Sequence, residues 1–279
     1  MGDSDALAKV AIVKGERSCQ TVRKAIEMVN GLDELADKPV LIKVNFICTK
    51  TYETGATTDP IIVEALIQIL KEINRNIFVV ESDATMTNAD EASRATGTLA
   101  LCEKYSVPFL NLRHYKEKVS VRVKSPEVMP KITFPRIVLE SHIISAAKLK
   151  THNETKVTLG LKNMFGLLPD KLKFKFHVMG IEKVIVDVNS IVRPALTIID
   201  GFFAMEGNGP VNGTPVKMDL VIAGKDPVAT DAVASKIMGF NPSLIYHIRR
   251  SAEKGIGTLE NIETVGEEIE AVSRVFKRS

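Results

Sequence analysis

Lysine, histidine and amide side chains directly follow an apolar run in the middle of this chain. Lys148, Lys150 and His152 end the run, and Lys162 and Asn163 come soon after it. Ammonium groups beside one imidazole can bind an anion and move a proton. We therefore expect His152 and Lys162 to act on an anionic ligand, with Lys148, Lys150 and Asn163 helping to bind it. A solvated basic edge is the competing interpretation, because lysines are usually exposed.

A second group of polar residues precedes a helix start. Asp59 can cap the free amides of a helix whose first residue is Pro60, a position where a missing N–H costs nothing. Plain capping would explain this turn, but the long loop before it is more typical of a site for a carboxylate or phosphate. The residues expected to bind that ligand are Lys43, Asn45, Gly55, Thr57 and Thr58.

A glycine-containing loop over residues 200–210 follows a third apolar run. Its glycines allow close approach of the backbone to a ligand, which Asn208 would help to bind, whereas a simple turn held by Asn208 is the alternative. Asp200 and Glu206 are candidates for orienting His152 or for holding a cation. No close ligand spacing such as HExxH is present, so the metal is unknown and a divalent ion stays open.

Residues 171–177 alternate cationic and apolar side chains. The pattern predicts a half-buried strand, or a basic flap that closes over an anion. A contact with RNA is a further alternative. Nucleic acid is not the expected partner, because the net charge is only +3 and aromatic platforms are scarce.

The composition is that of a globular chain: 279 residues, 45% hydrophobic and 25% charged. The three cysteines have no zinc-site or redox spacing, which favours a reduced, cytoplasmic protein. No apolar run reaches the length that crosses a bilayer, so no membrane partner is expected.

Short β-branched runs alternate with helix-length amphipathic stretches, which predicts an α/β fold with a largely parallel sheet flanked by helices. We expect two lobes with a polar cleft between them, residues 1–115 and 116–279, the second opening with a β-rich excursion near 116–140. Strands are expected over 10–14, 40–46, 77–81, 108–112, 143–149, 196–199 and 220–223, and helices over 21–29, 60–73, 89–104, 155–165, 181–191, 227–238 and 242–254.

An ordered series of short motifs resembles one uncharacterised family, called domain of unknown function three-six-two. The motifs are Lys43-Val44-Asn45, Gly55-Ala56-Thr57-Thr58-Asp59-Pro60, Lys150-Thr151-His152, residues 160–166, Ile199-Asp200-Gly201, residues 205–210, and Asp226-Pro227 with Asp231. The resemblance covers most of the chain and implies an α/β protein with a polar cleft and an unsettled activity. Its members often carry or neighbour ferredoxin-like iron–sulfur modules. This chain lacks the four-cysteine runs that hold such clusters, so we expect no intrinsic cluster.

The leading functional hypothesis is an intracellular enzyme, or an enzyme-derived binding protein, that holds a small anionic metabolite in the cleft. Proton transfer at carbon and a redox step fed by a partner would both use such a site. The alternative is a non-catalytic scaffold that docks a ferredoxin-like protein through residues 171–177. No cofactor is identified by the sequence.

Overall fold

The strands carry apolar side chains on both faces of the sheet, and helices cover both faces. In the computed structural model, which describes residues 7–32, 35–74 and 76–278, the strands form a nine-stranded sheet and a separate two-stranded one. The strands are β1 (Ala8–Lys14), β2 (Val40–Lys43), β3 (Ile77–Glu81), β4 (Phe109–Asn111), β5 (Lys118–Arg122), β6 (Lys131–Pro135), β7 (His142–His152), β8 (Lys156–Thr158), β9 (Leu196–Glu206), β10 (Thr214–Gly224) and β11 (Ile262–Gly266).

The helices separate into those that cover each face of the sheet and shorter ones in the connections. They are α1 (Cys19–Met28), α2 (Pro60–Ile73), α3 (Ala89–Ala95), α4 (Thr98–Lys104), α5 (Arg136–Leu139), α6 (Gly160–Met164), α7 (Phe174–Val178), α8 (Ile181–Ile191), α9 (Pro227–Ile237), α10 (Tyr246–Glu253) and α11 (Ile269–Val272). Short 3-10 turns cover Tyr52–Thr54, Leu112–His114, Phe165–Leu167 and Pro242–Leu244.

The large sheet is mixed but mostly parallel in its central part. Its order is β11-β1-β10-β9-β7-β2-β3-β4, with β8 paired to β7. The strands β9, β7, β2, β3 and β4 run parallel, whereas β10 is antiparallel to both neighbours. The predicted α/β class and largely parallel sheet are therefore confirmed.

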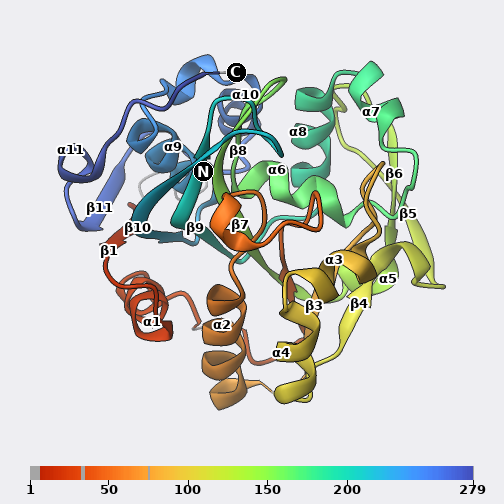
Figure 1. Cartoon of the computed structure of the whole chain (residues 1–279). Coiled ribbons are helices and arrows are strands. Elements are labelled where there is room, and N and C mark those ends of the chain that lie inside the picture. The colour runs from red at the N-terminus through yellow and green to blue at the C-terminus, as the bar shows by residue number, and fades with distance from the viewer. Residues whose placement is uncertain (1–6, 33–34, 75, 279) are drawn as a thin grey trace.

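Two apolar cores lie on opposite faces of this sheet. In β1, Val10 and Ile12 contribute to the core that contains α8 and α9, while Ala11 and Val13 contribute to the core that contains α1 and α2. Figure 1 shows these two pairs of helices on opposite sides of the strands. Burial on both faces explains why the central strands are continuously apolar rather than alternating.

Several predicted boundaries hold, and others are wrong for identifiable reasons. The helices over 60–73 and 181–191 and the strand over 77–81 are confirmed. The strand predicted over 40–46 ends at Lys43, and the helix predicted over 89–104 is interrupted at Gly97, which has a φ of +79°. An L residue adopts that conformation at a cost, whereas glycine adopts it freely.

The region between β7 and α8 differs most from the expected pattern. The helix predicted over 155–165 is wrong in its first part, because Lys156–Thr158 form β8 antiparallel to β7, with Val157 in the core, and α6 starts at Gly160. Residues 171–177 do not form a strand. They lead into α7, in which Phe176 is buried against Phe165 with their ring centroids 5.5 Å apart.

The β-rich excursion is present as the hairpin of β5 and β6, which pair antiparallel outside the large sheet. The large sheet draws strands from both sides of residue 115. The division into lobes 1–115 and 116–279 stays a prediction.

The helix α6 is held in place by one buried carboxylate. Asp231 on α9 accepts hydrogen bonds from the amides of Gly160 and Leu161, at 2.7 and 2.9 Å. These amides begin α6 and have no intrahelical acceptor, so Asp231 satisfies them from a neighbouring helix. The position of α6, and of every side chain it carries, depends on this contact.

Replacement of Asp231 by alanine is expected to lower the free energy of unfolding by about 2–5 kcal/mol, because two buried donors lose their acceptor. Chemical denaturation measures this change. Glu103→Ala, on the exposed surface of α4, is the matched control and is expected to stay within about 0.5 kcal/mol of wild type. Equal stability of the two variants would show that Asp231 does not anchor α6.

Candidate functional site

A polar pocket of about 270 Å³ opens where the parallel strands end. The carboxyl ends of β2, β3 and β7 meet at one edge of the sheet, the usual place for a ligand in an open α/β fold. Its lining residues come from both sides of residue 115: Lys43, Asn45, Phe46, Ile47, Glu81, Ser82, Ala84, Thr85, His152, Asn153, Glu154, Lys162, Asn163, Phe165, Gly166, Lys173, His177 and Pro210.

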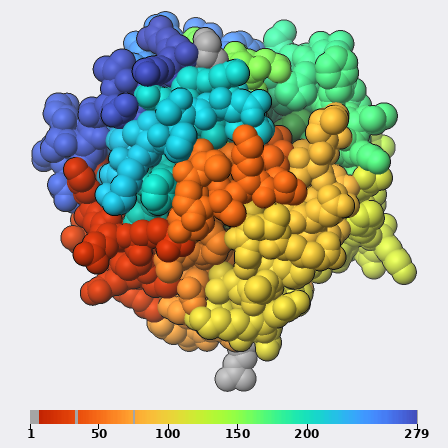
Figure 2. Space-filling view, in the orientation of Figure 1, coloured from red at the N-terminus to blue at the C-terminus, as the bar shows by residue number. Residues whose placement is uncertain are grey.

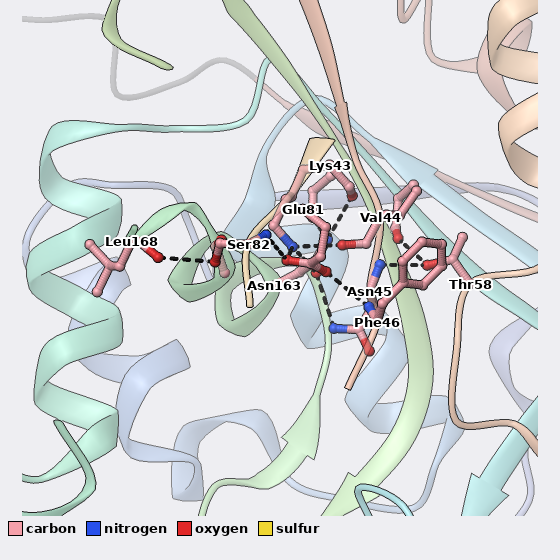
Figure 3. A network of polar contacts seen from close by, with 12 residues as sticks. Lys43, Val44, Asn45, Phe46, Thr58, Glu81, Ser82, Asn163 and Leu168 are labelled. Atoms are coloured by element: carbon pink, nitrogen blue, oxygen red, sulfur yellow. Dashed lines mark hydrogen bonds and ion pairs between the residues drawn. The ribbon is translucent and has the colours of Figure 1, made fainter. Parts of the chain in front are cut away.

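The floor of the pocket is a buried ion pair. Lys43, the last residue of β2, lies 2.7 Å from the carboxylate of Glu81, the last residue of β3 (Figure 3). That carboxylate also accepts hydrogen bonds from the amides of Phe46 and Ser82, each at 2.9 Å. Burial lowers the pKa of Lys43, and the charge of Glu81 partly offsets this.

Asn163 of α6 ties this pair to β7. Its amide nitrogen donates to the carbonyl of Lys43 at 2.9 Å and to the hydroxyl of Ser145 at 3.1 Å. Its oxygen accepts from Asn45 at 3.1 Å and from the Lys43 ammonium at 3.3 Å, as Figure 3 shows. All hydrogen-bonding atoms of the Asn163 side chain are thus used within the protein, which makes it a positioning residue.

The approach of α6 to the ion pair requires a glycine. A Cβ atom at position 166 would overlap the Lys43 ammonium and would lie 2.8 Å from a carboxylate oxygen of Glu81. The 3-10 turn that contains Gly166 can therefore close over the pair only without a side chain there.

Two further lysines face the pocket without a carboxylate partner. Lys162 of α6 makes no hydrogen bond or ion pair with any group in the described part of the chain. Lys173, just before α7, donates to the hydroxyl of Ser82 at 2.6 Å. Burial is the main cause that lowers the pKa of both, in each case to about 8. The pocket therefore presents two ammonium groups that are poorly neutralised by the protein.

His152 lies at the end of β7 with its proton location fixed by the backbone. Its Nδ1 accepts from the amides of Glu154 and Thr155, at 3.1 and 3.3 Å. An acceptor Nδ1 places the proton on Nε2, so the imidazole is a donor toward a ligand. Burial, together with the charges of Lys162 and Lys150, lowers the pKa of His152 far below its ordinary value.

His177 of α7 has the opposite arrangement. Its Nδ1 lies 2.9 Å from both carboxylate oxygens of Glu154. The neutral ring then carries its proton on Nδ1 and keeps the lone pair of Nε2 for a proton. One pocket wall therefore combines a donor imidazole, His152, with an acceptor imidazole, His177.

Several residues predicted for the ligand site lie elsewhere. Lys148 and Asp200 form a buried ion pair of 2.7 Å between β7 and β9, and Asp200 also accepts from the amide of Asp59 at 2.8 Å. Asp59 in turn pairs with Arg17 at 2.6 Å. Burial is the main influence on the pKa of Asp59 and raises it, which Arg17 opposes. None of these four residues lines the pocket described above.

Lys150 connects two loops through hydrogen bonds. Its ammonium donates to the carbonyls of Ala56 and Pro210, at 2.5 and 3.3 Å. Its burial, with the nearby charge of Lys162, lowers its pKa to about 7. Figure 2 shows the segment around residue 50 (orange) lying beside the segment around residue 210 (cyan), where Lys50 also donates to the carbonyl of Val211 at 3.0 Å.

The turn at residues 55–58, predicted to bind a ligand, makes its contacts within the protein. Gly55 has a φ of +72° and lies against the carbonyl of Ala204, where a Cβ atom would overlap. The hydroxyl of Thr57 donates to the carbonyl of Lys50, and that of Thr58 donates to the carbonyl of Ala146. This turn packs against β7 and β9 and does not line the pocket.

The two remaining predicted residues also lie outside the pocket. Glu206, the last residue of β9, accepts from Arg274 at 3.3 Å and from the amide of Lys277 at 3.1 Å. Asn208 is exposed. In the described part of the chain neither Glu206 nor Asp200 forms a hydrogen bond or ion pair with His152. Two backbone amides orient this imidazole in place of the expected carboxylate.

The pocket also contains residues that were not among the predicted site residues, including Glu81, Ser82, Glu154, Lys173 and His177. Glu81 carried a usable signal, because a carboxylate that ends an apolar strand must meet a partner at the sheet edge. Lys173 and His177 lie in residues 171–177, for which a basic flap was one of the predictions. The sequence does not indicate which side chains of this segment face the pocket.

Within residues 7–32, 35–74 and 76–278, no group of three His, Cys, Asp or Glu side chains could hold a metal ion. The helices in the same residues include none that is long and apolar enough to span a bilayer.

The tautomer of His152 is testable. We expect nitrogen-detected NMR to show a neutral imidazole protonated on Nε2 that does not titrate as the pH falls from 8 to 5, because its pKa is far below the ordinary value. The exposed His114 serves as the reference imidazole in the same spectra. Protonation of His152 at about pH 6 would contradict the donor assignment.

The comparisons with known proteins agree with the motif series. Over 235 residues the chain is 26% identical to the thylakoid-associated protein sll1697 of Synechocystis sp. (strain ATCC 27184 / PCC 6803 / Kazusa). The aligned region covers 81% of this chain and 71% of that protein. No solved structure matches. Residues 40–236 match the family described as "Domain of unknown function (DUF362)", and this match includes all of the pocket residues. The chain belongs to the DUF362 family.

Proposed function

We propose that the pocket binds a small anionic metabolite of the carboxylate or phosphate class. The observation that carries this proposal is Lys162, an ammonium group that faces the pocket and has no bonding partner in the described residues. The Lys162 side chain is half-buried, and an ammonium group in such a place without a counter-ion from the protein attracts an anion.

The charges of the pocket support an anion rather than a cation. Lys43 is neutralised by Glu81. Because His177 is a neutral ring, Glu154 is the remaining carboxylate of the pocket, and the two lysines Lys162 and Lys173 outnumber it. The Nε2–H of His152 is an additional donor. Three donors that converge on one cavity suit the several oxygens of a carboxylate or phosphate.

The size of the pocket favours a small ligand. Its volume of about 270 Å³ lies just below the common range for ligand pockets, about 300–1,000 Å³. The protein is proposed to be an enzyme, because a donor imidazole and an acceptor imidazole in the same pocket suit proton transfer on a bound anion. A redox step fed by a partner is the second form of this chemistry. The proposed location is the cytoplasm, which the free thiols of Cys19, Cys48 and Cys102 support.

Sulfate is a suitable probe because its charge does not change near neutral pH. We expect Lys162→Met to weaken sulfate binding by about 10- to 100-fold, the loss of one charge-assisted hydrogen bond. Affinity for the wild type should fall as the pH rises from 7 to 9, because Lys162 and Lys173, with pKa values of about 8, lose their protons over this range. Isothermal titration calorimetry measures both effects.

The matched control is Lys24→Met, on the exposed face of α1 and away from the pocket. This variant should bind sulfate as wild type does. Equal weakening by both substitutions, or no sulfate binding by any form of the protein, would count against the pocket as an anion site.

A second function is favoured by the outer surface of α7 and the residues before it. Leu172, Phe174 and Val178 are 70%, 67% and 74% exposed, and Lys171 and Lys175 lie among them. Exposed apolar groups clustered on one short segment mark an interaction surface. We propose that this surface docks an acidic, ferredoxin-like protein, to which the lysines are complementary in charge.

The double variant Phe174→Ser with Lys171→Glu is expected to weaken binding of a purified ferredoxin by about tenfold or more, since it removes an apolar anchor and reverses one charge. Val275→Ser, which alters a side chain that is 82% exposed near the C-terminal end of the chain, is the control. Surface plasmon resonance at low and high salt should show weaker binding as ionic strength rises. Binding to anionic lipid vesicles in place of ferredoxin would contradict the docking proposal.

A further inference from the structure

Lys162 is chemically distinct from the other lysines around the pocket. Lys43 is held by Glu81, Lys173 by Ser82, and Lys150 by two backbone carbonyls. The Lys162 ammonium has no such bond to the part of the chain that the structure describes. It is therefore the lysine of this group whose nitrogen can approach a ligand atom without first breaking a protein contact.

The environment of Lys162 also favours its neutral amine. The charged and titratable groups around it come from each neighbouring element: Lys43 and Glu81 from β2 and β3, Lys150 and His152 from β7, Glu154 from the β7–β8 turn, Lys173 and His177 from α7 and the turn before it, and His247 from α10. Burial lowers the pKa of Lys162 to about 8; the charge of Glu154 opposes this, and the charge of Lys43 adds a smaller lowering effect. At pH 7 this gives on the order of 100-fold more neutral amine than an ordinary lysine has. Neutral amines are the nucleophiles that attack carbonyl groups.

The rest of the pocket supplies what a carbonyl reaction needs. Lys173 and the Nε2–H of His152 are donors for a carboxylate and for the developing oxygen charge. His177, oriented by Glu154, offers a lone pair on Nε2 for a proton. All of these groups line the same cavity of about 270 Å³, together with Lys162.

We propose that Lys162 forms an imine with a small 2-oxo acid bound in this pocket. The inference rests on the anion-binding function proposed above and specifies its ligand as an anion with an adjacent carbonyl group. The unpartnered amine of Lys162 would react with the carbonyl group, and Lys173 and His152 would bind the carboxylate.

The step is a condensation without an oxidant or reductant. The neutral Nζ of Lys162 attacks the carbonyl carbon and forms a C–N bond, while the C=O π bond breaks and its oxygen takes a proton from the Lys173 ammonium. The nitrogen then gives up one proton, for which His177 is the acceptor, to leave a neutral carbinolamine. Return of that proton to the hydroxyl group breaks the C–O bond, one water molecule leaves, and the product is the protonated imine.

Reductive trapping tests this directly. The full-length protein is incubated with glyoxylate, the smallest 2-oxo acid, reduced with borohydride and mapped by peptide mass spectrometry. We expect the adduct on Lys162 in roughly tenfold or greater excess over exposed lysines such as Lys24, because the bound anion raises the local concentration of the carbonyl. Acetaldehyde, which lacks the carboxylate, should lose this preference, and sulfate should protect Lys162 from glyoxylate.

Lys162→Arg separates the two proposals, because arginine keeps the positive charge but does not form an imine under these conditions. This variant should still bind sulfate in calorimetry and should yield no adduct at position 162. Sulfate binding that depends on residue 162, without any adduct on Lys162 in the wild type, would overturn the imine and leave the anion site standing. Absence of both sulfate binding and a selective adduct would overturn both, and a selective adduct on Lys173 would overturn the assignment to Lys162.

Discussion

The buried ion pair of Lys43 and Glu81 is the constraint on which the arrangement of the pocket depends. Two charges at the ends of neighbouring parallel strands are tolerated only where their remaining hydrogen-bonding capacity is filled, and breaking such a pair costs about 3–5 kcal/mol. Here the amides of Phe46 and Ser82 and the side chain of Asn163 fill it. These contacts fix the loop after β2, the start of the loop after β3, and α6 together. The floor of the pocket is consequently neutral, and the positive charge that a ligand meets comes from Lys162 and Lys173.

The helix–strand alternation could be predicted from sequence because each element carries a local signal. The Asp59 cap followed by Pro60 defines the start of α2, where the carboxylate accepts from the amide of Ile61 as expected. The lengths of β7, β9 and β10 could not be predicted. The outer half of β7 contains charged residues that are buried where β7 pairs with β9, a strand far along the chain, and no local pattern encodes that pairing.

The site was only partly predictable for a related reason. Sequence placed Lys43, Asn45, His152, Lys162 and Asn163 at strand ends, and the structure brings these residues together in one pocket. It also placed Lys148 and Asp200 there, but a cation and a carboxylate at opposing positions of adjacent strands neutralise each other. The proximity of His177 to Glu154 depends on how α7 folds back over β7, which residue types alone do not reveal.

The helix α7 joins two surfaces that have different chemistry. On its inner side Phe176 packs against Phe165 of the pocket wall, and His177 lines the pocket. On its outer side Phe174 and Val178 are exposed to solvent. A helix of five residues is too short to be stable by itself, so its position is set by what it contacts on each side. An occupant of the pocket and a protein on the outer surface would therefore bind to one shared element. If a ligand in the pocket changes the affinity for the docked protein, thermodynamic linkage requires that the docked protein change the affinity for the ligand by the same factor.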